Sequence, residues 1–356
     1  MSDYFDRVER QIVNRVNAGA APAARMPALF GRLGYAAAVL VVVIVVGVFL
    51  LARGPGSPRP AGPAAGGHGL SVSFTPQFLP GGSGASATIS RTLRVLRERL
   101  HQAVPGAHVS WAGGRIVVRV SDSRHGARAQ IVALTAPGRL EFYDWEASVV
   151  TPNGKTVASQ LKAQDPTALT ISQGGASATP GGSGAGGLSL AKALALAAKE
   201  PVSARAILVE AIGDGAGYPA DTQDPTAQYY VLRDSPALAG SDITNPRLST
   251  DPNARVPDIT FGFTSGGGKA FHALTAEVAR RGALVSGLGQ TLNQHFAIVL
   301  DNRLLTVPYI GYMQYPDGIN GDNGADLSGT FTTTAAKDIA ILLRYGTLPV
   351  TLMPAG

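Results

Sequence analysis

The longest apolar stretch of the chain runs from Leu33 to Ala52 and contains no charged or strongly polar side chain. Twenty helical residues rise roughly 30 Å, which matches the hydrocarbon core of a bilayer. A buried core helix would need a polar face toward water, which residues 39–47 do not offer. A cleaved secretory signal would begin closer to the N-terminus and would end at a small-x-small site. The pattern therefore predicts one uncleaved transmembrane helix over 33–52.

Arginines are more frequent before this stretch than after it. Arg15, Arg25 and Arg32 precede it, whereas only Arg53 and Arg59 follow it closely. Because Lys and Arg resist translocation, the bias predicts a cytoplasmic N-terminus and a large extracytoplasmic region at the plasma membrane.

The N-terminal segment, residues 1–32, carries its own apolar pattern. In Tyr4–Val16 the apolar residues recur at helical spacing between arginines. This amphipathic pattern is typical of an interfacial helix on the cytoplasmic side, and a partner-binding tail is the alternative.

A compact unit is predicted over residues 88–145, after a Gly/Pro-rich tether and a first strand, Leu70–Phe74, in residues 53–87. Apolar residues from Ile89 to Val104 recur at spacings of three and four, which predicts an amphipathic helix. Further elements are expected as strands Val109–Trp111, Arg115–Val120 and Leu140–Trp145 and a helix Ala127–Leu134. On the first helix we expect a solvated charged face, with contact to an anionic surface as the alternative, at Arg91, Arg94, Arg97 and Arg99.

Residues 146–240 lose this periodicity and are predicted to form an insertion. Thr179–Gly187 consists almost entirely of Gly, Ser, Pro and Ala, which is typical of a linker. Around it the pattern predicts only one helix, within Leu188–Glu200, and one strand, Tyr229–Leu232.

Residues 241–356 are the most regular part and are predicted to form a second α+β subdomain. Asp301-Asn302 is expected to be a hairpin turn. The expected strands are Ile259–Thr264, Phe296–Leu300, Leu304–Ile310, Leu327–Phe331 and Leu348–Leu352. The expected helices are Gly268–Arg281 and Thr332–Leu343, the latter with Ala336, Ile339, Ala340 and Leu343 facing inward.

Composition narrows the classes of protein. With 356 residues and 45% hydrophobic content the chain can bury one or two cores, while 44 Gly and 24 Pro indicate linkers. The absence of cysteine excludes disulfides, thiolate catalysis and Cys-based zinc sites. The net charge of +6 includes the arginines around the apolar stretch, so no nucleic-acid partner is predicted.

Two motifs suggest chemistry only at first sight. Phe263–Ala270 (FTSGGGKA) is not a P-loop, because Phe and Ala stand where a first Gly and a final Ser or Thr are needed, so we expect a glycine-rich helix entry. The acidic loop offers oxygens to a cation, but an ordinary turn is favoured because its spacing is not that of an EF-hand. Its side chains are Asp317, Asn320, Asp322, Asn323 and Asp326.

No catalytic, cofactor or metal site is predicted. The six histidines show no pair at metal-ligand spacing, and His295 is expected to be a strand-edge residue rather than a base. No G-x-S-x-G elbow occurs with a readable triad, so the chain is not expected to be an enzyme.

The ordered segments resemble the exported region of SecD, the accessory membrane subunit of the Sec protein-export machinery. The resemblance rests on TLRVLRERLHQAVPGAHVSWAGGRIVVRV, LTAPGRLEFYDW and ITFGFTSGGGKAFHALT, and most of all on AIVLDNRLLTVP followed by SGTFT and LLRYGTLPV. It implies ferredoxin-like α+β subdomains, a head and a base, behind one transmembrane helix. It also implies contact with unfolded preprotein, with SecF and the SecYEG channel as partners.

The sequence departs from the SecD pattern in one respect. SecD proteins continue into further spans with an acidic residue for proton-driven movement, whereas no ionisable residue lies in 33–52 and Gly356 closes the chain soon after LPV. We therefore expect a membrane-anchored export factor without its own proton relay. The alternatives are a cell-envelope scaffold that reuses the fold and, less favoured, a solute-binding domain.

Overall fold

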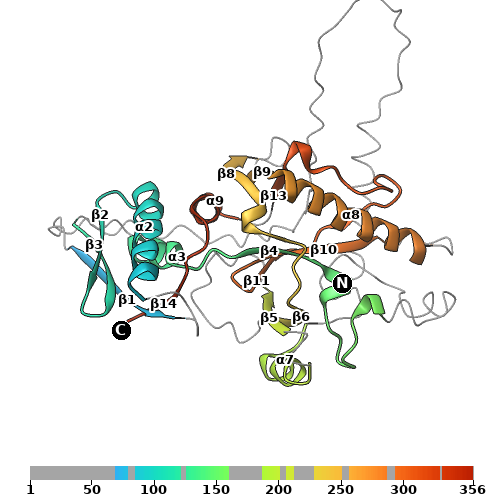
Figure 1. The fold of residues 1–356 in the computed structure, drawn as a ribbon, viewed down its shortest axis with the longest axis horizontal. Coiled ribbons are helices and arrows are strands. Elements are labelled where there is room, and N and C mark those ends of the chain that lie inside the picture. The colour runs from blue at the N-terminus through green and yellow to red at the C-terminus, as the bar shows by residue number, and fades with distance from the viewer. Residues whose placement is uncertain are drawn as a thin grey trace, which may run out of the picture.

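The structure is a computed structural model of the chain (Figure 1). It describes residues 69–78, 85–121, 126–159, 187–200, 206–211, 228–250, 256–286, 293–328 and 331–355. The predicted N-terminal helix, the apolar stretch 33–52 and the linker 179–186 lie outside these ranges. Within the described residues, no helix is both long and apolar enough to cross a membrane.

The first sheet has four antiparallel strands in the order β14-β1-β3-β2. Its strands are β1 (Leu70–Gln77), β2 (Ala107–Ala112), β3 (Arg115–Val120) and β14 (Thr351–Pro354). Alternate residues such as Val72 and Phe74 point to one face, where α2 (Ala85–Ala103) and α3 (Ala127–Leu134) cover them. The edge strand β14 joins the chain's last described residues to its first described strand.

The second sheet runs in the order β6-β5-β11-β10-β4-β7, with β12 also paired to β10. All its pairs are antiparallel except β11 with β5. Its strands are β4 (Leu140–Asp144), β5 (Ala206–Ala211), β6 (Gln228–Arg233), β7 (Leu238–Ala239), β10 (Gln294–Leu300), β11 (Arg303–Thr306) and β12 (Tyr309–Ile310). The short helix α4 (Trp145–Ser148) follows β4, and α7 (Leu190–Ala197) lies beside β5 and β6.

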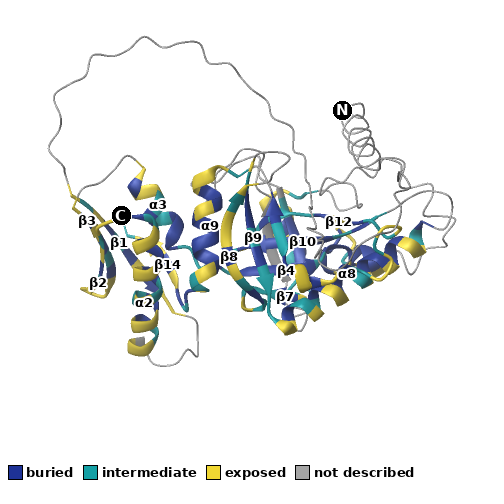
Figure 2. Ribbon diagram, turned by 90° about the horizontal axis from the view of Figure 1, so that it is seen from above, coloured by how far each residue is buried: buried dark blue, intermediate teal, exposed yellow. Residues whose placement is uncertain are grey.

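The third sheet is antiparallel in the order β13-β9-β8. Its strands are β8 (Ile243–Thr250), β9 (Pro257–Phe263) and β13 (Ala325–Ser328). Helix α8 (Ser265–Val285) packs along β10, and the single turns η2 (Gly240–Asp242) and η3 (Gly321–Asn323) lie against it. Helix α9 (Thr333–Tyr345) lies between α2 and α3 on one side and β8 and β9 on the other (Figures 1 and 2).

Helix α9 connects the layers because it is buried on more than one side. The four predicted inward residues are buried, and so are Ala335, Ile341 and Leu342 (Figure 2). One continuous hydrophobic core therefore runs from the first sheet through α9 to the third sheet and α8.

The mixed α/β class with antiparallel sheets is confirmed. Local predictions also hold where periodicity is strong, as in α2, β3 and β10. The turn at Asp301 and Asn302 is confirmed by their φ angles of 53° and 62°, which a type I′ hairpin requires. The glycine-rich helix entry is confirmed too, because α8 begins at Ser265 and the Thr264 side chain accepts a hydrogen bond from Gly267 N.

Three predicted strands differ from the structure in detail. The expected closing strand Leu348–Leu352 is β14, which begins only at Thr351 and ends at Pro354. The expected strand Leu304–Ile310 is two short strands, because β11 pairs with one part of β10 and β12 with another. The expected strand Leu327–Phe331 begins earlier, at Ala325. Strand β8 was not expected at all, since ITNPRLST has no clear alternation and is ordered by its pairing with β9.

The solvated position expected for Arg99 was also wrong, because its side chain is fully buried. Its guanidinium donates hydrogen bonds to carbonyl oxygens that follow α3 and α9. The acceptors are Leu134 O at 3.0 Å, Ala136 O at 2.6 Å, Pro137 O at 3.0 Å and Gly346 O. Arg99 therefore joins α2 to the ends of two other helices, and its charge is compensated by backbone dipoles rather than by water.

Candidate functional site

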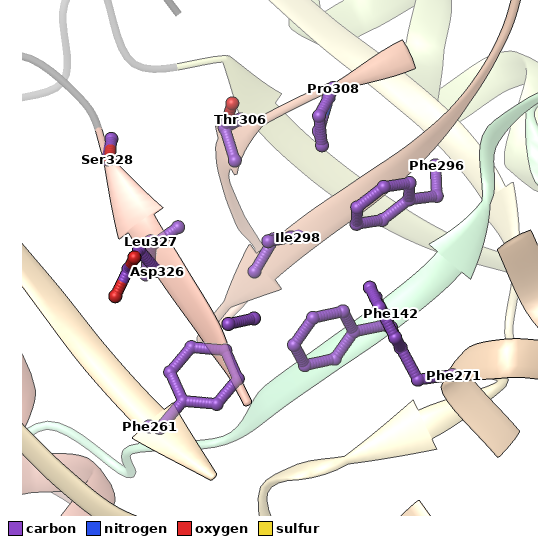
Figure 3. A pocket seen from close by; sticks show the side chains of 11 residues that line it. Phe142, Phe261, Phe271, Phe296, Ile298, Thr306, Pro308, Asp326, Leu327 and Ser328 are labelled. Atoms are coloured by element: carbon purple, nitrogen blue, oxygen red, sulfur yellow. The ribbon is translucent and has the colours of Figure 1, made fainter. Parts of the chain in front are cut away.

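A small apolar cleft of about 20 Å³ lies between the second and third sheets, beside β13 (Figure 3), and most of the side chains in its walls are almost fully buried. Four phenyl rings line it, and each comes from a different element: Phe142 from β4, Phe261 from β9, Phe271 from α8 and Phe296 from β10. In Figure 3 the rings of Phe142, Phe261 and Phe296 lie around Ile298 of β10.

The polar side chains of the cleft are few. Thr306 of β11 and the β13 residues Asp326 and Ser328 contribute them, while Leu327 adds apolar surface. Such a lining is suited to apolar groups, with a small number of hydrogen-bonding positions to orient them.

The aromatic rings hold one another in place. Phe142 and Phe261 meet edge to face with their centroids 6.3 Å apart, and Phe261 meets Phe263 in the same way at 5.5 Å. Phe263 stacks on Phe271 at 4.8 Å, and Phe271 meets Phe296 edge to face at 5.9 Å. Each ring pair adds to the packing energy, so the cleft is lined by a continuous row of phenyl rings that hold one another in fixed positions.

Strand β13 forms one side of the cleft and is an edge strand. Within the described part of the chain, β13 pairs only with β9, through the register Ala325↔Phe261 to Ser328↔Asp258. Its second edge has no strand partner among the described residues, and it is half-buried at its first two residues and buried at Leu327 and Ser328.

The glycine-rich loop before β13 sets the position of this edge. Gly324 has φ of 75°, and a Cβ there would collide with Phe261 O. Ile319 N donates a hydrogen bond to Thr275 Oγ1 of α8 at 2.8 Å, and a Cβ on Gly318 would come within 2.5 Å of Ala276 N. Only a loop with glycine at these points can pack this closely on α8.

A buried polar cluster at the far end of β4 and β10 anchors α8. Arg281 of α8 pairs with Asp144, and its Nη2 lies 3.7 Å from Glu146 Oε2. Glu146 in turn accepts hydrogen bonds from the backbone N of His295 and lies 2.7 Å from its Nδ1. Burial raises the pKa of Asp144, and the Arg281 charge partly opposes that rise. The cluster keeps α8, and with it Phe271, over the cleft.

His295 pairs with Tyr309 of β12 near the start of β10, and its ring has a carboxylate partner, which its isolated position in the sequence did not indicate. In the acidic loop, Asn320 accepts a hydrogen bond from Asp322 N, as in an ordinary turn. The described residues contain no group of three or more potential metal-binding side chains. The cleft itself was not predicted, because its rings come from segments far apart in the chain. The only signal was the alternation in Ile259–Thr264.

The region around the cleft is similar to a known protein family. Residues 218–350 match the family model described as "SecDF, P1 head subdomain", a range that contains β8, β9, β13 and α8. Strand β13 and every lining residue of the cleft except Phe142 fall within this matched range.

Curated relatives agree with this match. The protein translocase subunits SecD of Rickettsia bellii and Rhodobacter capsulatus are 34% and 33% identical over 124 and 121 residues. The subunit of Synechocystis is 33% identical over 112 residues. These matches cover 35%, 34% and 32% of the chain but only 20%, 18% and 21% of the relatives, so they span about a fifth of those proteins. The findings support a SecD-family protein, and the resemblance drawn from the sequence is confirmed.

Solved structures give a looser likeness. A crystal structure of SecDF in a super-membrane-facing form matches with a TM-score of 0.46 and 21% identity, covering 82% of this chain and 30% of that one. A structure titled as a membrane component SecDF that enhances protein export matches with a TM-score of 0.43 and 20% identity, covering 81% and 98%.

Proposed function

We propose that this protein is a membrane-anchored accessory factor of Sec-dependent export that binds extended segments of preprotein on the outer side of the membrane. One observation carries the proposal: a small cleft lined by four phenylalanines lies beside the edge of β13 that has no partner among the described strands, and all its lining residues except Phe142 fall in the range that matches the SecDF head. An unfolded chain presents unpaired backbone groups and apolar side chains together, and this site complements both.

The geometry favours weak, reversible binding. A segment added to β13 would form two or three backbone hydrogen bonds, each worth about 1 kcal/mol net, and place alternate side chains over the mouth of the cleft. Burial of one or two apolar side chains adds about 2 kcal/mol each, and the loss of translational and rotational freedom offsets at least 4 kcal/mol. The balance is at most about 3 kcal/mol and corresponds to dissociation constants of several millimolar or weaker, which suits a factor that must release a moving chain.

The anchor proposed for this activity is the helix predicted over 33–52, with the N-terminus in the cytoplasm. Since that stretch has no ionisable residue, this helix supplies no proton relay. SecF and the SecYEG channel are the proposed partners, and no catalytic role is proposed.

Photo-crosslinking in membranes tests the proposal. A benzophenone amino acid replaces Thr306 in the cleft of the full chain, and an arrested preprotein occupies SecYEG. The matched control carries the same group at Met313, which is 71% exposed and does not line the cleft. We expect adducts from position 306 and few from position 313. Equal yields, or none from 306 while the channel is engaged, would refute binding in the cleft.

Co-purification separates the proposal from the alternative of an envelope scaffold. The full chain, extracted in mild detergent, is expected to retain Sec subunits. Recovery of wall or envelope components without any Sec subunit would favour the scaffold.

A further inference from the structure

The outer face of the first sheet is open and basic. Helices α2 and α3 cover the other face, and α9 and the second and third sheets lie beyond these helices (Figures 1 and 2). On the open face Arg119 of β3 lies between two cross-strand neighbours, His108 of β2 on one side and Ser71 of β1 on the other. Arg115 shares this face with Arg119, since four residues separate them in β3.

No carboxylate balances these charges within the sheet. The four strands LSVSFTPQ, AHVSWA, RIVVRV and TLMP contain no Asp or Glu. Thr75 and Met353, paired between β1 and β14, are both exposed on the same face. The face therefore combines guanidinium groups, hydroxyl groups and one thioether, with no acidic side chain to repel an anion.

The charge is unevenly divided along the chain. Residues 69–139 contain nine arginines but only two acidic residues, Glu98 and Asp122. Residues 140–356 contain nineteen acidic residues and fourteen Lys or Arg. A net charge of opposite sign on the two parts orients a protein in an external field, so the first sheet would turn toward a negative surface.

Sequence position places the basic face near the proposed anchor. Strand β1 begins at Leu70, only a short tether, residues 53–68, after the predicted helix ends. A tether of sixteen residues with this composition spans roughly 20–25 Å, which keeps β1 close to the bilayer surface.

We propose that this face of the first sheet, centred on Arg115 and Arg119, lies on the anionic lipid headgroups of the membrane. The inference rests on the anchoring that the proposed function includes. Guanidinium groups bind phosphate oxygens in pairs of hydrogen bonds, and the neighbouring serine and threonine hydroxyl groups donate to the same acceptors. Contact here points the cleft, which lies beyond α2, α3 and α9, away from the bilayer.

Fluorescence quenching in nanodiscs tests the inference. Since the chain has no cysteine, a single Thr75→Cys variant of the full chain carries one fluorophore on the basic face. Gln102→Cys carries it on the exposed side of α2, the opposite side of the same unit. The nanodiscs contain headgroup spin-labelled lipid, with or without phosphatidylglycerol.

We expect quenching at position 75, but not at 102, on nanodiscs that contain phosphatidylglycerol. The double variant Arg115→Gln with Arg119→Gln should lower the ratio of membrane-bound to unbound first sheet about 25-fold, since each arginine strengthens binding to an anionic surface about 5-fold. Arg91→Gln with Arg94→Gln removes the same charge from the exposed side of α2 and should leave quenching unchanged. Salt should weaken the contact.

Equal quenching at the two positions, or equal effects of the two arginine pairs, would overturn the inference. Protection of position 75 by added unfolded preprotein instead of lipid would also overturn it, in favour of a polypeptide-binding face. A chain that inserts but shows no quenching refutes this inference alone. A chain that does not insert removes the anchoring and refutes the proposed membrane attachment as well.

Discussion

Replacing Arg99 by methionine should destabilise the junction between α2, α3 and α9. Methionine keeps most of the volume but removes every hydrogen bond to the four carbonyl groups. The bond to Leu134 O is buried, so its loss costs about 1–3 kcal/mol, and the three half-buried carbonyls lose about 1 kcal/mol each. The expected loss is about 4–6 kcal/mol. At 2–4 °C per kcal/mol for a chain of this size, the melting temperature should fall by roughly 10–20 °C.

Thermal unfolding of the full chain in detergent measures this shift. The matched control is Arg97→Met, two residues away on α2, which removes the same charge. Arg97 is exposed and donates only to Val109 O, at 3.2 and 3.3 Å, so its replacement should cost about 1 kcal/mol or less. If the two variants melt within 2 °C of each other, the reasoning about buried backbone acceptors is wrong.

Two further variants test the loop before β13 and a buried carboxyl. Gly324→Ala forces a Cβ against Phe261 O at positive φ, so it should lower both the melting temperature and the crosslink yield at Thr306. The control is Gly106→Ala, which has φ of 77° and open space around it and therefore carries only the backbone strain. Equal effects of the two variants would contradict the role given to the loop. Burial raises the pKa of Asp338, so the native state binds this proton more tightly than the unfolded state and stability falls as pH rises above about 4. Asp338→Asn keeps the bond from Gln130 and does not ionise, so its melting temperature relative to the parent should increase between about pH 4 and 7; a constant difference would contradict the assignment.

Local periodicity predicted the elements but not their partners. The stripes of α2 and α9 and the alternation of β3 depend on neighbours three, four or two residues away, so the sequence alone indicates them. The pairing of β14 with β1 joins Met353 to Thr75, and no local pattern marks such a contact.

Arg99 shows most clearly which contacts local sequence patterns cannot predict. On a helical wheel it lies beside the exposed arginines of α2, but the carbonyls that bind it come from segments 35 to 247 residues away in the chain. A charged residue at a buried position is visible only when its acceptors are placed in space. The cleft could not be predicted for the same reason, since the sequence around each of its phenylalanines is typical of an ordinary buried core residue.

The central claim is that a preprotein lies extended along β13, and disulfide scanning tests it most directly. The chain has no cysteine, so Thr306→Cys can be paired with a series of single cysteines at consecutive positions of an arrested preprotein. Strand pairing with β13 predicts crosslink yields that alternate with a period of two residues, because alternate side chains lie over the mouth of the cleft. Uniform yields, or a helical period near 3.6 residues, would contradict binding by strand addition.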